Sequence, residues 1–281
     1  MRKVNPLTDL VFKKFMGEKG DEVQLQAFLE AVLDRKLKDI EIVEATELPP
    51  DIIGDKLSRL DVRAKSGSDT DINIEVQLKD HRNMDKRSLF YWSRLFGKSL
   101  KAGSDNDYNM LPNVITINIL KFDFLDEPEE EFHNIYHIRN DRSGKILTDS
   151  FEIHFLEFKK FLRLKEKDIV KNAIHRWLAF LDNNISEKIL QELIEMDTAI
   201  RQANKKIEYI SNDEATYHQI MLRELAVLDY NSDVAAAKRE GKAEADAEKI
   251  AIAKSLLGIL DIATITEKFK LTSEEVEKMQ N

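Results

Sequence analysis

The pattern of apolar and polar positions predicts helices at both ends of the chain, with strands and one further helix between them. Helical periodicity is seen at 7–16, from Asp21 or Glu22 to about 35, at 82–101 and from about 166 onward. Alternating or continuous apolar runs predict strands at 40–45, 59–64, 71–77, 113–120, 133–139 and 151–158. The run at 113–120 is nearly continuous, which is typical of a buried strand.

Two of these strands are joined by a short connection rich in Gly, Ser and Asp, at residues 65–70. This composition favours a hairpin, which would make the two strands antiparallel neighbours. The first strand carries Asp61, and the second carries Glu75 and Gln77. Side chains alternate along a strand, so Glu75 and Gln77 share a face while Val76 points the other way. We therefore expect two carboxylates and a long polar side chain to converge.

Such a pair of carboxylates has two interpretations. With the backbone carbonyl of Val76 and water, Asp61 and Glu75 would suit a hard divalent cation such as Mg²⁺ or Mn²⁺. That cation can polarise a phosphodiester and help to generate a hydroxide nucleophile. Alternatively, Asp61 and Glu75 are only surface charges on a half-exposed hairpin. The spacing alone does not decide between the two.

Composition limits the class of protein to which this chain can belong. The chain has 281 residues, 42% of them hydrophobic and 34% charged, with a net charge of −9, which suits a helix-rich domain with a core. There is no cysteine, which excludes disulfides and cysteine-ligated zinc. We find neither an apolar run of 18 residues nor the apolar core of a signal peptide, so we expect no membrane span and a cytoplasmic location.

The predicted helix at 82–101 lies in a basic part of this acidic chain. Residues 79–101 contain seven Lys or Arg against two Asp. A helical projection places Arg87, Tyr91, Arg94 and Lys98 on one face and Leu89, Trp92, Phe96 and Leu100 on the opposite face. The basic face is either a surface for DNA phosphates or an ordinary solvated helix face.

Five segments in order resemble one known family. They are Asp9-Leu10-Val11-Phe12-Lys13, Leu60-Asp61-Val62, Ile74-Glu75-Val76-Gln77, Tyr91-Trp92-Ser93-Arg94-Leu95-Phe96 and Pro112-Asn113-Val114-Ile115-Thr116-Ile117-Asn118-Ile119. Together they resemble the Rpn family of recombination-promoting nucleases, transposase-like members of the PD-(D/E)XK superfamily, over roughly residues 5–160. The resemblance implies an α/β fold, with a mixed central sheet flanked by helices and a helical C-terminal extension.

The resemblance also implies roles for individual residues. Asp61 and Glu75 would bind the metal, with a ligand from the backbone carbonyl of Val76. Gln77 stands where most members have Lys, and it would position the attacking water without supplying a charge. The missing charge could come from Lys79 or Lys56, although both also fit the description of ordinary exposed lysines. Asp9 could add a metal ligand or could equally serve the start of its helix. His81 could approach phosphate or be incidental.

We divide the chain into residues 1–160, a nuclease-like domain, residues 161–234, a helical extension packed on it, and residues 235–281. The last part combines an Ala-rich charged helix with a small helical hairpin, whose final helix would be capped by Thr272 or Ser273. The acidic final helix suits protein contacts better than a DNA groove. We therefore expect that the chain can form a homo-oligomer through these helices.

Three hypotheses follow for function. The first is a Mg²⁺-dependent DNA endonuclease with Asp61, Glu75 and Gln77 at its centre. The second is a catalytically weak or inactive nuclease fold that acts as a binding or assembly module, which the missing Lys and the net acidity favour. The third, an unrelated α/β scaffold, requires the carboxylates of Asp61 and Glu75 to lie far apart.

Overall fold

The computed structural model describes residues 3–43, 62–80, 82–97, 107–272, 274 and 276. Its centre is a six-stranded mixed sheet in the order β1-β2-β3-β4-β6-β5. The antiparallel ladder β1-β2-β3 continues into the parallel strands β3, β4 and β6, and β5 is antiparallel to β6 at the edge. The strands are β1 (Ile40–Ile42), β2 (Val62–Ser66), β3 (Thr70–Gln77), β4 (Asn113–Leu120), β5 (His133–Tyr136) and β6 (Phe151–Glu157).

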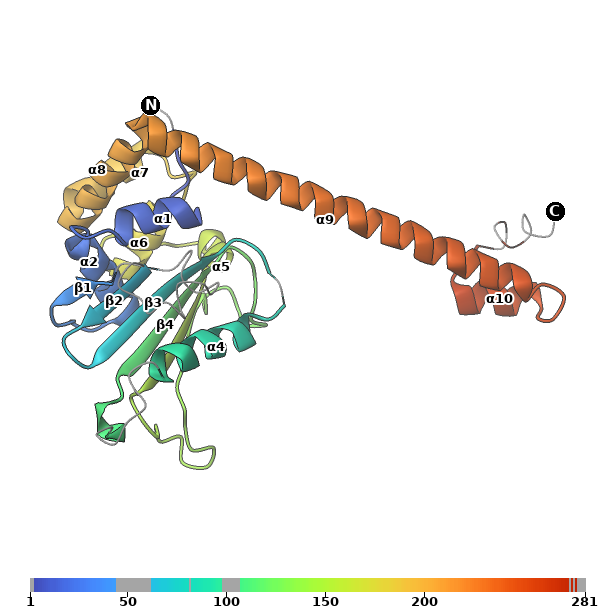
Figure 1. Ribbon diagram of the computed structural model, residues 1–281, viewed down its shortest axis with the longest axis horizontal. Coiled ribbons are helices and arrows are strands. Elements are labelled where there is room, and N and C mark those ends of the chain that lie inside the picture. The colour runs from blue at the N-terminus through green and yellow to red at the C-terminus, as the bar shows by residue number, and fades with distance from the viewer. Residues whose placement is uncertain are drawn as a thin grey trace. The chain divides into compact units, whose positions relative to one another are not determined.

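Helices flank both faces of this sheet, as Figure 1 shows. Helix α4 (Met84–Gly97) packs on β4 on one face. Helix α1 (Asp9–Met16) contacts β3, and α2 (Glu22–Leu33) contacts β1. Further helical elements in the described part of the chain are η3 (Tyr108–Met110), α5 (Phe158–Arg163), α6 (Ala173–Phe180), α7 (Glu187–Met196), α8 (Thr198–Asn212), α9 (Glu214–Ser255) and α10 (Ile262–Phe269). The predicted fold class is confirmed.

The elements follow the sequence pattern closely. The two N-terminal helices are present, and the second begins at Glu22 after Asp21. The predicted hairpin is β2-β3, whose turn is shorter than expected because the ladder extends to the pair Ser66–Thr70. Gly67, in this turn, has a positive φ of 60°, a conformation that favours glycine. The first strand is only Ile40–Ile42 long.

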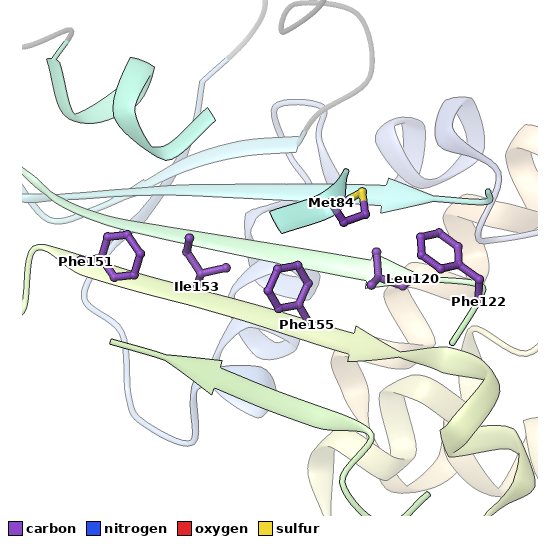
Figure 2. Close-up of a cluster of buried hydrophobic side chains, with 6 residues drawn as sticks. All are labelled: Met84, Leu120, Phe122, Phe151, Ile153 and Phe155. Atoms are coloured by element: carbon purple, nitrogen blue, oxygen red, sulfur yellow. The ribbon is translucent and has the colours of Figure 1, made fainter. Parts of the chain in front are cut away.

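The face of the sheet under α4 is divided into an apolar half and a polar half. Its apolar half is a cluster of side chains from α4, β4, β6 and the segment after β4, drawn in Figure 2: Met84, Leu120, Phe122, Phe151, Ile153 and Phe155. Trp92 of α4 packs against this cluster. Since these residues bury the helix against β4 and β6, α4 is held over the neighbouring strand β3, where the face becomes polar.

The chain forms two compact units, Met1–Tyr217 and His218–Asn281. The second unit contains nearly all of the 42-residue helix α9. Near its end, Ala253 packs with Ile265 and Val276. Ser273 lies outside the described residues, so the predicted cap of the last helix stays a prediction, as does the division at 160 and 234. No described helix is both long enough and apolar enough to cross a membrane.

Candidate functional site: a polar layer between the sheet and helix α4

Strand β3 alternates between polar and apolar side chains along its buried length. Ile72, Ile74 and Val76 are buried, and the period of two places Asn73, Glu75 and Gln77 on the other face of the strand. Glu75 is 1% exposed and Asn73 is fully buried. The face with Glu75 is the one under α4, because Arg87 of this helix contacts the Glu75 carboxylate. The predicted common facing of Glu75 and Gln77 is therefore present.

The neighbouring strands extend this polar surface. In the register of the sheet, Asn73 lies opposite Arg63 of β2 and Thr116 of β4. Asn118 of β4 lies opposite Glu75. Residues at paired positions point to the same face, so these side chains form one polar layer, and all of them are buried.

The carboxylate of Glu75 is held asymmetrically. Its Oε1 accepts a hydrogen bond from Gln77 Nε2 at 2.6 Å and another from Arg87 Nε at 2.8 Å, and it forms an ion pair with the Arg87 guanidinium. Its Oε2 is buried and has no hydrogen-bond partner among the described residues. Burial raises the pKa of Glu75, and the nearby charge of Arg87 opposes this effect. One carboxylate oxygen is thus fixed, while the other has no hydrogen-bond partner among the described residues.

Helix α4 packs differently from its projection on the sequence. The projection has Leu89 on the apolar face and Tyr91 on the basic face, which predicts a buried Leu89 and an exposed Tyr91, and both predictions are wrong. Leu89 is 49% exposed and Tyr91 is 5% exposed, and the helix buries Met84, Ser88, Tyr91 and Leu95. The cause is the polar sheet surface beneath the helix: Ser88 donates to Asn118 Oδ1, and Arg87 reaches Glu75. Trp92, by contrast, does pack on the apolar cluster.

The other predicted site residues are either outside the described part of the chain or placed as follows. Asp61 and Lys98 lie outside the described residues, as do Lys56 and His81. Asp9 begins α1, and its carboxylate accepts a hydrogen bond from the backbone N–H of Leu10. Val76 is buried on the opposite face from Glu75, so only its backbone could serve the site. Arg94 is half-buried.

Of the polar layer only Glu75 was given a role from the sequence, and the role of Arg87 above it was a different one. Arg87 was expected on a DNA-facing surface, yet its guanidinium is bound to Glu75. Asn73 and Asn118 received no role, although each continues a period-two pattern that includes Glu75 or Thr116. Asn118 Nδ2 donates to the backbone carbonyl of His154, which ties β4 to β6. Alternation of Thr and Asn within the apolar run 113–120 was the signal that could have found this residue.

The described residues contain no group of three acidic or histidine side chains able to hold a metal ion. Glu75 Oε2 is buried and has no hydrogen-bond partner among the described residues. Carboxylate oxygens such as this one are the ligands that hard cations prefer. Glu75 Oε2 therefore fits the role of a ligand to a divalent cation, provided that a second carboxylate binds the same cation. The second predicted carboxylate, Asp61, directly precedes Val62, and Val62 pairs with Ile74, the residue before Glu75.

The order of elements α1-α2-β1-β2-β3-α4-β4, with a buried carboxylate on β3, defines an α/β domain of the restriction-endonuclease type. A family model described as PD-(D/E)XK nuclease family transposase matches residues 6–237, and the chain belongs to this family. It is a nuclease-type family, and its nucleases generally use divalent metals.

A second comparison found a local similarity to a much longer protein. The chain is 30% identical over 115 residues to a protein named "Putative histone-lysine N-methyltransferase 1" from Plasmodium falciparum (isolate 3D7). The match covers 40% of this chain and 2% of that protein, so it carries no functional argument. No solved structure matches the chain.

Proposed function

We propose that this protein is a Mg²⁺- or Mn²⁺-dependent DNA endonuclease that hydrolyses phosphodiester bonds at Glu75. The observation that carries the proposal is the asymmetric carboxylate of Glu75. Its Oε1 is fixed by Gln77 and Arg87, while its buried Oε2 has no partner among the described residues. A buried carboxylate oxygen without a partner is costly unless it serves a ligand.

We propose that Asp61 and Glu75, with the backbone carbonyl of Val76, hold the cation, and that Asp9 does not. The carboxylate of Asp9 already accepts a hydrogen bond at the start of α1, which is a favourable position for an acidic side chain. When bound, a divalent cation polarises the phosphodiester and lowers the pKa of a water molecule. The position of Asp61, one residue before the ladder partner of Ile74, supports its part in the site.

In most of the superfamily a single lysine both orients the water and supplies a positive charge. We propose that Gln77 takes the first of these roles here and Arg87 the second. In this proposal Gln77 orients the water through its side-chain amide, because Gln77 lies on the same face as Glu75 and contacts it. Arg87 supplies the positive charge that Gln77 lacks, since its guanidinium already lies at the Glu75 carboxylate. A fixed charge near the reacting phosphate stabilises the negative charge that develops in the transition state.

DNA is the substrate in this proposal, and Arg94 and Lys98 are its phosphate contacts. Arg87 is engaged by Glu75 at the proposed reaction centre and Tyr91 is buried, so neither belongs to the proposed surface for the phosphates away from that centre. Phosphate contacts carry no sequence information, and we therefore expect binding that is sensitive to salt and tolerant of sequence.

The decisive experiment is plasmid nicking by the full chain with Mg²⁺ or Mn²⁺, against a chelator control. We expect Asp61→Ala and Glu75→Gln to abolish nicking, while Asp69→Ala, which removes an exposed acid from the turn of the same hairpin, leaves it unchanged. Calcium should bind and support little turnover. Full nicking by Asp61→Ala would refute the metal assignment.

A second candidate function is that of an assembly module. Exposed apolar side chains gather on the first half of α9, at Leu222, Leu225, Val227, Leu228, Tyr230 and Val234. A stretch of helix with this many exposed apolar side chains is typical of a contact surface. We propose that two copies of the chain associate through this stretch of α9. If nicking is absent in every metal tested, this function becomes the leading one.

A further inference from the structure

The face of the sheet opposite Glu75 carries a chain of hydrogen-bonded ionisable groups. Glu152 of β6 accepts two hydrogen bonds from Arg35, at 3.0 and 2.8 Å, and its Oε1 lies 2.7 Å from His154 Nε2. The other ring nitrogen of His154, Nδ1, lies 2.8 Å from His133 Nε2. His154 is fully buried. His133 is therefore the last member of a chain that begins at Arg35.

The protonation of this chain follows from its partners. Burial opposes ionisation of Glu152, but hydrogen bonds from His154 and Arg35 outweigh burial and lower its pKa to about 2. The carboxylate is charged at neutral pH, so His154 Nε2 must donate to it. Burial and the neighbouring His154 lower the pKa of His133 to about 4, so its ring is neutral at pH 7.

A neutral imidazole has one N–H and one lone pair, so His133 can form one hydrogen bond through Nδ1 besides the one that joins its Nε2 to His154. This Nδ1 makes no hydrogen bond to any described residue. Because neutral His133 is a weak base, its use is to form a hydrogen bond with a ligand rather than to take a proton in catalysis.

His133 lines a cleft of about 900 Å³ between α2, β5 and the start of α6. This volume is in the usual range for small-molecule sites. Part of its wall is apolar: Ile135, which is 49% exposed, lies in it with Ala27, Ala31 and Ile174. A ligand with an apolar body would cover this surface and gain from its burial.

Most charges around the cleft are neutralised by one another. Lys36 Nζ pairs with Glu30 at 2.6 Å, Arg176 Nε lies 3.6 Å from Asp197, and Arg35 is held by Glu152. Two lining charges remain, Lys171 and Asp34, and both are exposed. Neither has an ion-pair partner in the part of the chain that the structure describes. The cleft thus presents one positive group, one negative group and one neutral ring nitrogen able to form a hydrogen bond.

We propose that this cleft binds a small zwitterion with an apolar body, of the class formed by free amino acids and short peptides. The ligand carboxylate would pair with Lys171 and its ammonium group with Asp34. Its apolar part would cover Ile135, and a polar group would form a hydrogen bond with His133 Nδ1. A ligand with a single charge would gain only one of these two ion pairs. This inference is independent of the nuclease function.

Binding of chosen probes to the full chain, by calorimetry and ligand-observed NMR, tests the proposal. Leucine and leucyl-leucine are the zwitterions, and whichever binds more tightly identifies the source of the ligand. N-acetylleucine lacks the ammonium charge and leucinamide lacks the carboxylate. A hydrogen bond to a charged group contributes enough that each loss should weaken binding by about 10-fold or more.

Variants locate the site. Lys171→Glu and Asp34→Asn should each weaken zwitterion binding by about 10-fold, and His133→Phe should weaken it as well. Lys145→Glu and His218→Asn change exposed residues outside the cleft and should leave binding unchanged. Should His133→Phe fail to fold, the two surface variants still decide the question. The proposal is overturned if neither zwitterion binds at millimolar concentration, if the single-charge analogues bind equally well, or if Lys171→Glu and Asp34→Asn bind normally.

Discussion

The guanidinium of Arg87 on α4 is paired with Glu75 Oε1 on β3, where Glu75 is 1% exposed. Removing one partner of a buried ion pair leaves an uncompensated charge, at a cost of about 3–5 kcal/mol in stability. We therefore expect Arg87→Ala to be strongly destabilised, and the double variant Glu75→Gln/Arg87→Ala to recover much of that loss. Urea unfolding measures the coupling. Lys86→Ala, which changes an exposed neighbour on the same helix, is the control. Additive effects of the two changes would show that the pair contributes nothing.

Gln77 is expected to act on rate more than on stability. One well-placed hydrogen-bond donor contributes on the order of 10²-fold in rate, so Gln77→Ala should lower nicking by about that factor. Gln77→Lys should keep or raise activity, because it restores the charged group found in most of the superfamily. Gln202→Ala, at an exposed position of α8, provides the comparison. An unchanged rate in Gln77→Ala would mean that another group, with Lys79 and Lys56 first to test, positions the water.

The DNA surface is tested through the dependence of affinity on salt. If Arg94 and Lys98 each contact a phosphate, replacing both by Ala should reduce the slope of log affinity against log salt by roughly 1.8, at about 0.9 per contact. The matched variant removes two exposed positive charges elsewhere, at Arg142 and Lys145, and should keep the slope. A slope that stays the same in the first variant would place the DNA elsewhere.

Self-association through α9 predicts a change in mass. Replacing Leu225 and Leu228, which are 54% and 61% exposed, by Glu should convert a dimer into a monomer in sedimentation experiments, because like charges would face each other at the interface. Ala243→Glu with Ala247→Glu adds the same charge to exposed positions of the same helix, outside the apolar stretch. A wild-type chain that sediments as a monomer at high concentration would exclude this assembly.

The hydrogen-bonded chain at His133 predicts acid sensitivity in two steps. His133 has a pKa of about 4 in the folded protein against an ordinary 6.5. The unfolded chain therefore takes up the proton first, and stability falls as the pH drops from 6.5 to 4. Glu152, with a folded pKa of about 2 against 4.5, contributes stability that is present above pH 4.5 and lost as the pH falls towards 2. Each step lowers the free energy of unfolding by up to about 3 kcal/mol.

Urea unfolding across this pH range checks both steps. The variant His133→Asn should show a weaker dependence between pH 6.5 and 4, with only the contributions of other groups such as His175 left, while His218→Asn, at an exposed histidine, should retain the full dependence. The step below pH 4.5 should remain in His133→Asn and disappear in Glu152→Gln. If wild type and His133→Asn show the same dependence above pH 4, the ring of His133 is not held neutral by the fold.

The sequence by itself determined the elements of the core and the class of fold. Local rules decide these features: the period of two along β3, the continuous apolar run of β4 and the Gly-containing turn of the hairpin. The same alternation was enough to place Glu75 and Gln77 on one face. For these residues, the information lies within a few positions along the chain.

Only the tertiary structure decided which face of α4 is buried and what Glu75 contacts. A helical projection assumes that the partner surface is apolar, but Asn73, Thr116 and Asn118 make this part of the sheet polar. Helix α4 therefore turns Arg87 and Ser88 inward, and Leu89 is left exposed. The chain from Arg35 to His133 likewise joins residues about a hundred positions apart. Such contacts depend on how strands and helices stack, which no short pattern in the sequence records.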